Sequence, residues 1–170
     1  GCANDRLHRE GLDLVKDGRL EEGLAVLEQA ARESPRNLGF RADYIRERDR
    51  AIAYLLLMGE RATTAGRPLE AAAYFQRVLA LDSENAKARD GMVAIETGLR
   101  HENIVKEAQS LFDKGDLGPS LAQLQPVLLE NPEHAAAKEL RSQIDARLAQ
   151  QAVTQPSLTS KFKRPVNLQF

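Results

Sequence analysis

The side chains best suited to chemistry are three histidines and one cysteine. His8, His101 and His134 stand far apart, without cysteine or carboxylate partners at the spacing that metal ligands need. We therefore expect no zinc site and predict that the histidines are exposed helix or cap residues. A single cysteine, Cys2, excludes an internal disulfide and a multi-cysteine metal site. The sequence holds no nucleophile elbow, phosphate-binding glycine loop or His-Glu-x-x-His motif, which predicts a protein without enzymatic activity, metal or cofactor.

The fold class that positions these residues is predicted from composition. The 170 residues include 24 Lys+Arg and 25 Asp+Glu, and this formal net charge of -1 excludes a generally basic nucleic-acid binder. The hydrophobic fraction of 42% can form a core, while aromatic residues make up only 5%. Ala, Leu, Glu, Arg and Gln are abundant, and because these residues favour helices we predict an all-α protein. The longest apolar run, Ala51 to Met58, is too short to span a bilayer.

An internal repeat organises the chain. Gly18, Gly66 and Gly115 lie 48 and 49 residues apart, and similar apolar patterns flank each of them. Glycine readily adopts the left-handed backbone conformation that ends a helix, so each copy is predicted to be a helix, a glycine turn and a second helix.

The segments between the copies are predicted to be helical as well. Residues 38–65 and 85–114 contain no proline and carry apolar residues at helical spacing. Each is expected to form one long helix that fuses a linker helix to the first helix of the next copy. A helix over 135–153 is expected to close the array as a cap. Pro126 falls inside the last hairpin helix and predicts a kink there, whereas the charged run Arg46 to Arg50 is expected to be a solvated helix face.

The three copies resemble the tetratricopeptide repeat. They share a small residue in the first helix, the turn glycine, a small and then a bulky residue in the second helix, and a closing position. In that order the residues are Gly11, Gly59 and Ala108; Gly18, Gly66 and Gly115; Gly23, Ala71 and Ser120; Leu27, Phe75 and Leu124; and Pro35, Ser83 and Pro132. The copies lack the family's early tryptophan and mid-helix tyrosine. Their period exceeds the family's ~34 residues by about four helical turns, which agrees with the long fused helices.

This resemblance implies a repeat domain over 4–153, with copies over about 4–37, 52–85 and 101–134 and the cap over 135–153. It also implies that protein partners bind exposed inner positions of the first helices. These positions are Asp5, His8, Leu12, Val15, Ala53, Leu56, Glu60, Thr63, Glu102, Val105, Gln109 and Phe112. The alternative, that Leu12, Leu56 and Phe112 are core residues, stays open at this point.

The last part of the sequence has a second resemblance. Residues 154–164 read as a polar linker that ends in a small basic cluster of Lys161, Lys163 and Arg164. The following Pro165-Val166-Asn167-Leu168-Gln169-Phe170 resembles the opening strand of the short N-terminal domain of bacterial outer-membrane secretins. Residues 165–170 are therefore expected to be the start of a truncated secretin domain, and secretins of type II secretion and type IV pilus systems provide the expected setting.

The N-terminus is similar to that of a bacterial lipoprotein. Gly1 supplies the small residue that precedes the lipidated cysteine, and Ala3 in place of aspartate suggests sorting to the outer membrane. We therefore expect Cys2 to carry lipid and the chain to lie at the periplasmic face of the outer membrane. The alternative is an unmodified N-terminal thiol behind a vector-derived glycine.

Together the two resemblances predict a non-catalytic protein–protein interaction module of an outer-membrane secretin, which serves protein secretion or type IV pilus biogenesis. The expected partners are proteins of that machine, with no nucleic acid, and homo-oligomers are expected only in the full-length secretin. Two alternatives remain at this stage. One is a stand-alone repeat lipoprotein that assists secretin assembly, as a pilotin does, and the other is a soluble repeat adaptor with no membrane link.

Overall fold

The chain is all-α. The computed structural model describes residues 1–154, and within them 86% of the residues are helical and no strand occurs. The helices are α1 (Cys2–Lys16), α2 (Leu20–Glu33), α3 (Leu38–Thr64), α4 (Pro68–Leu81), α5 (Ala86–Asp113), α6 (Leu117–Glu130) and α7 (Ala135–Thr154). None of them has both the length and the apolar character needed to cross a membrane. The expected second-domain start, and the expected linker apart from Thr154, lie outside the described residues.

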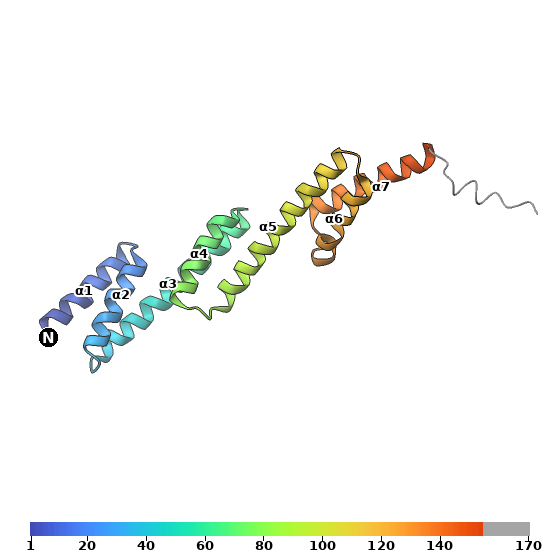
Figure 1. The fold of residues 1–170 in the computed structure, drawn as a ribbon. Helices are drawn as coiled ribbons and strands as arrows, with labels where there is room; N and C mark the ends of the chain where they lie inside the picture. Colours follow the sequence, from blue (N-terminus) through green and yellow to red (C-terminus); the bar gives the residue numbers. More distant parts are fainter. Residues whose placement is uncertain (155–170) are drawn as a thin grey trace, which may run out of the picture. The chain divides into compact units, whose positions relative to one another are not determined.

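The helices belong to two compact units. Unit 1 is Gly1–Glu96, and unit 2 begins at Thr97, so the division falls inside α5. Within unit 1, α1 and α2 lie side by side, α2 also lies beside α3, and α4 packs on α3 (Figure 1). Within unit 2, α6 packs on α7. We call α1–α2 the first hairpin, the second half of α3 with α4 the middle hairpin, and the second half of α5 with α6 the third hairpin.

Each hairpin turns at a glycine with a left-handed backbone. The φ angles of Gly18, Gly66 and Gly115 are +85°, +75° and +83°, a region that favours glycine. At the first turn, Gly18 N–H donates to the Val15 carbonyl and Arg19 N–H donates to the Leu14 carbonyl, each at 3.0 Å. Equivalent pairs of bonds close the turns at Gly66 and Gly115. The predicted glycine turns are confirmed, and all three share these two hydrogen bonds, while the third has one more, from Leu117 N–H to the Gly115 carbonyl at 3.0 Å.

A second type of turn recurs before α3, α5 and α7. Its last residue caps the following helix with its own side chain: Asn37 Oδ1 accepts from Phe40 N–H at 3.2 Å, and Asn85 Oδ1 accepts from Ala88 N–H at 3.0 Å. Before α7 the same role falls to His134, whose Nδ1 accepts from Ala137 N–H at 3.2 Å. These bonds satisfy amide groups that the first turn of a helix leaves without a partner.

Small residues bring the helices of each hairpin close together. A Cβ added to Gly11 would lie 2.8 Å from Leu27, and in the middle hairpin a Cβ added to Gly59 would lie 2.6 Å from the Phe75 ring. A Cβ added to Gly91, in the first half of α5, would also lie 2.6 Å from the same ring. Phe75 is therefore held between two glycines, with 3% of its surface exposed.

Unit 2 has its own hydrophobic core. It joins the second half of α5 to α6 and α7, and its buried residues are Ala108, Phe112, Leu117, Leu124, Val127, Ala137, Leu140 and Ile144. Ser120 is fully buried, and its hydroxyl donates to the Ala108 carbonyl at 2.7 Å. The small residue at this position thus lets α6 approach α5 closely while its one polar group stays hydrogen-bonded.

The long helices are continuous where the sequence predicts continuity. α3 runs unbroken through Arg46 to Arg50, and Arg46, Asp49 and Arg50 are exposed as expected of a solvated face. Glu47 and Arg48 differ, because both are half-buried, and the Arg48 guanidinium donates to the carbonyl of Leu81, the last residue of α4, at 2.7 Å. The negative end of the α4 dipole also stabilises a cation at this position. Pro126 lies inside α6, which continues to Glu130.

Candidate functional site on the inner helix faces

The twelve predicted partner-binding positions differ in exposure. Asp5, Ala53, Glu60, Thr63, Glu102 and Gln109 are exposed, His8, Leu12, Val15, Leu56 and Val105 are half-buried, and Phe112 is buried. The positions belong to three separate hairpins, and the surroundings of each hairpin differ.

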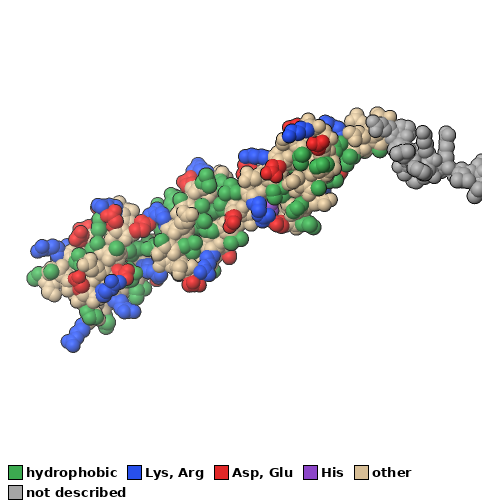
Figure 2. Space-filling view, viewed as in Figure 1, with side chains coloured by type: hydrophobic (Ala, Val, Ile, Leu, Met, Phe, Trp, Pro, Cys, Tyr) green, Lys and Arg blue, Asp and Glu red, His purple; other side chains and the backbone are tan. Residues whose placement is uncertain are grey.

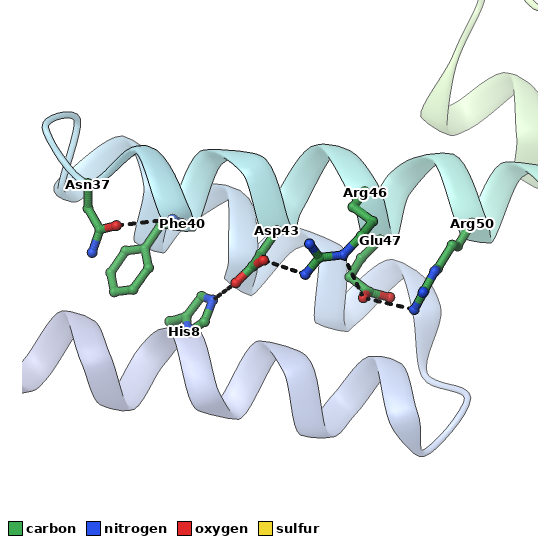
Figure 3. Close-up of polar contacts among 7 residues, drawn as sticks. All are labelled: His8, Asn37, Phe40, Asp43, Arg46, Glu47 and Arg50. Atoms are coloured by element: carbon green, nitrogen blue, oxygen red, sulfur yellow. Dashed lines mark hydrogen bonds and ion pairs between the residues drawn. The ribbon is translucent and has the colours of Figure 1, made fainter.

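In the first hairpin, α3 covers part of the predicted face. The His8 ring of α1 stacks on Phe40, with ring centroids 4.3 Å apart, and its Nε2 lies 2.8 Å from Asp43 Oδ2 (Figure 3). Phe40 is buried with 7% of its surface exposed. The inner side of α1 at His8 is therefore occupied by the first half of the next long helix.

Charged side chains continue from this contact along α3. Asp43 also pairs with Arg46, and Glu47 lies 3.5 Å from Arg50 and 3.9 Å from Arg46 (Figure 3). The arginines are more than half exposed, so each pair contributes about 0–1 kcal/mol in water. On the face shown in Figure 2, acidic and basic side chains are likewise interspersed.

In the middle hairpin, an open groove lies on the predicted face. Its volume is about 450 Å³, and its lining residues are Glu60, Thr63 and Thr64 of α3, Phe75 of α4, and Lys87, Asp90, Gly91 and Ala94 of α5. Of the predicted positions, Glu60 and Thr63 line it. The buried Phe75 ring between its two glycines contributes an apolar wall, and exposed charged residues contribute the rim.

Residue size explains why this groove is open in the middle hairpin. Counting from the shared turns, Thr63 corresponds to Val15 and Phe112, and Gly91 corresponds to Asp43 and Leu140. In unit 2 both larger residues, Phe112 of α5 and Leu140 of α7, are buried in the core, and the Arg147 guanidinium lies 4.6 Å from the centroid of the Phe112 ring. The structure therefore places Phe112 in the core of unit 2, whereas the other eleven predicted residues keep exposed surface.

A second groove was not predicted from the sequence. It has a volume of about 400 Å³ and lies between α2 and α3, with Ala31, Pro35, Tyr44, Ile45, Glu28, Arg32 and Arg41 along its walls. The Tyr44 hydroxyl donates to Glu28 at 3.3 Å, and the pKa of Tyr44 is raised, first by burial and then by the Glu28 charge. Ile45 is 44% exposed. The sequence signal that could have revealed this groove was an apolar residue on the outer side of a charged helix.

One ion pair ties the first hairpin to the middle hairpin. Arg77 of α4 donates from Nε and Nη2 to the two carboxylate oxygens of Glu21 on α2, at 2.6 and 3.1 Å. The bonds from Arg77 lower the pKa of Glu21, and the same bonds raise the pKa of Arg77. Both side chains are at least 40% exposed, so solvent limits the contribution of this pair to about 1 kcal/mol at most.

In unit 2 two histidines and a carboxylate meet where α6 ends. His101 Nε2 lies 2.6 Å from Glu130 Oε2, Arg100 also donates to Glu130, and the His134 ring lies edge-on to His101 with centroids 6.0 Å apart. The prediction that histidines are exposed or cap residues holds for His134, which is a cap. It is wrong for His101, which is only 3% exposed because the α5–α6 contact covers it, and for His8, which is half-buried against Phe40 and Asp43.

Replacing Glu130 by glutamine should change how stability depends on pH. The pKa of Glu130 is lowered from its ordinary 4.5, first by the Arg100 hydrogen bond and then by His101. A lowered carboxyl pKa gives stability that is present above about pH 4.5 and is lost as the pH falls through the folded-state value. Urea midpoints of the full chain between about pH 6 and about pH 3 should therefore fall less steeply for Glu130→Gln than for the wild type. Equal slopes would contradict this account.

The described residues contain no group of three His, Cys, Asp or Glu side chains placed to hold a metal ion. Cys2 is the first residue of α1 and is exposed. Comparison of the chain with protein-family models, curated proteins and solved structures gave no match.

Proposed function

We propose that this chain is a non-catalytic, tetratricopeptide-like repeat module that binds protein partners. The single observation that carries the proposal is the open groove on the inner face of the middle hairpin. The three glycine turns support the repeat assignment, because the same two backbone bonds recur at the spacing of the sequence repeat. A repeat-based binding module needs equal turns, closely paired helices and one accessible inner face.

The proposed partner segment lies in the groove between α3 and α5. Thr63, Gly91 and Ala94 are small residues, so a partner's main chain can come close to the helices above the buried Phe75 ring. Glu60, Lys87 and Asp90 at the rim provide both signs of charge for orienting a polar segment. A groove with an apolar wall and a few polar groups is the usual form of such binding sites.

The proposed setting is the periplasmic side of the outer membrane, within a secretin for protein secretion or type IV pilus biogenesis. Its support is sequence resemblance at the two ends, namely Gly1-Cys2-Ala3 and residues 165–170. An exposed Cys2 at the start of α1 is accessible to lipid attachment. Several acyl chains would anchor the protein firmly, since each buried CH₂ contributes roughly 0.8 kcal/mol.

Site-specific crosslinking in the cells that carry the full gene tests the binding face. A photoreactive phenylalanine at Ala94, in the groove, should give an adduct with a protein of the secretion or pilus machine. The matched control is the same residue at Ala73, an exposed alanine of α4 outside the groove. An adduct at Ala94 and none at Ala73 is the expected result. Equal crosslinking at both positions, or none at Ala94, would overturn the assignment of the groove.

The same cells test the setting independently. Labelled fatty acid should enter the wild-type protein and fail to enter Cys2→Ser, and the wild type should fractionate with the outer membrane. If both proteins carry equal label, or if the wild type is found only in the cytoplasm, the secretin lipoprotein assignment fails. Crosslinking confined to Ala94 would then favour a soluble adaptor, because the groove does not depend on the lipid.

A further inference from the structure

The turns before α3, α5 and α7 are equivalent in backbone bonding but not in the chemistry of their caps. Asn37, Asn85 and His134 each donate their own N–H to the carbonyl three residues earlier, at 2.9, 3.1 and 3.1 Å. Each then accepts the third amide of its helix with a side-chain atom. Two acceptors are amide oxygens, which do not titrate, and the third is an imidazole nitrogen, which does.

The α7 cap therefore needs a neutral His134. Nδ1 can accept from Ala137 N–H only while it carries no proton, which places the proton of the neutral ring on Nε2. Protonation would turn Nδ1 into an N–H donor that faces the Ala137 N–H, which is also a donor. It would also place a positive charge at the positive end of the α7 dipole. Both effects act against the first turn of α7.

The charged groups around His134 determine whether another contact offsets this loss. α5 contributes His101 and Arg100, and α6 contributes Glu130, which already holds Arg100 at 3.0 Å and His101 at 2.6 Å. Beside the ring in the turn, Glu133 is paired with Lys138 of α7 at 3.2 Å. Both nearby carboxylates thus have other partners, and a protonated His101 would add a second positive charge 6.0 Å away between ring centroids.

We propose that His134 is a pH-sensitive cap that releases the first turn of α7 in mildly acidic solution, whereas the asparagine caps of α3 and α5 keep their helices closed. The first turn matters for unit 2 because Ala137 and Leu140 are buried in its core, at 0% and 2% exposure. Acidification would therefore loosen α7 from α6, and this inference does not depend on the proposed binding function.

Amide hydrogen exchange of the full chain, followed by NMR, tests this inference with internal controls. From about pH 7.5 to about pH 5.5, the protection of the Ala137 amide should fall about five-fold after correction for intrinsic exchange. The Phe40 and Ala88 amides hold the same position in α3 and α5, and their protection should stay constant. If Ala137 keeps its protection at the acidic end, the proposal is wrong.

Two variants separate the cap from other effects of acid. His134→Asn should make the Ala137 protection independent of pH, and Asn85→His should transfer the acid sensitivity to Ala88. If His134→Asn still loses protection at Ala137, the response comes from another group, such as His101, and the inference is overturned. Nitrogen shifts of the His134 ring give a separate readout, because an acceptor Nδ1 at neutral pH differs from a protonated one.

Discussion

Replacing Gly91 by leucine is expected to destabilise the middle hairpin by about 2 kcal/mol. The new Cβ would lie 2.6 Å from the Phe75 ring, and the ring cannot move away because Gly59 touches its opposite side. Overpacking of this kind costs about 3 kcal/mol at its upper end, and the better helix propensity of leucine offsets about 0.8 kcal/mol. Urea unfolding of the full chain, followed by circular dichroism, measures the change.

The chain supplies both a control and a rescue for this variant. Gly98 lies in the same helix, but a Cβ there would meet no atom within 4 Å, so Gly98→Leu should not destabilise the protein. Unit 2 has Ala108, Leu124 and Leu140 at the positions of Gly59, Phe75 and Gly91. The triple variant Gly59→Ala, Phe75→Leu, Gly91→Leu should therefore recover most of the lost stability. Similar midpoints for Gly91→Leu and Gly98→Leu would contradict the packing argument.

Truncation of Leu124 to alanine is expected to have a larger effect, about 3 kcal/mol or more. The side chain is completely buried in the core of unit 2, so its removal loses apolar contacts and leaves a cavity. The core around Leu124 is formed by the helices of unit 2 alone, so its loss should act mainly on those helices. Hydrogen exchange should therefore show reduced protection in α6 and little change in α2.

Leu129 provides the matched control for this truncation. It lies in the same helix and is 83% exposed, so Leu129→Ala should change stability by no more than about 0.5 kcal/mol. If Leu124→Ala lowered protection in α2 as much as in α6, the two units would unfold together. The assignment of separate cores would then be wrong.

The helices and their turns were predictable because their signals are local. The glycine at each hairpin turn marks where a helix ends, and a run without proline marks where a helix continues. The structure confirms α3, α5 and α7 within one or two residues of the predicted bounds. The tetratricopeptide resemblance and the partner surface stay predictions, since the groove is a binding site only by proposal.

The sequence could not show which helices cover the inner faces of the hairpins. The first half of α3 packs on α1 at His8, and α7 packs where Phe112 lies, and both contacts join residues distant in the chain. Thr63 and Phe112 occupy equivalent positions, yet one lines a groove and the other fills a core, because Gly91 and Leu140 differ in size. Burial of His101 likewise depends on Glu130, 29 residues away.

The shared use of α3 has a consequence for how such a chain can change in length. Its first half contacts α1 through Phe40 and Asp43, and its second half contacts α4 through Gly59, with no break between them. One residue inserted at mid-helix would turn the second half by about 100° relative to the first, so both contacts could not be kept. A whole copy can be added or deleted only between equivalent points of two long helices. A cut at the loop before α3 would therefore leave that helix whole but separate Phe40 and Asp43 from their contacts on α1.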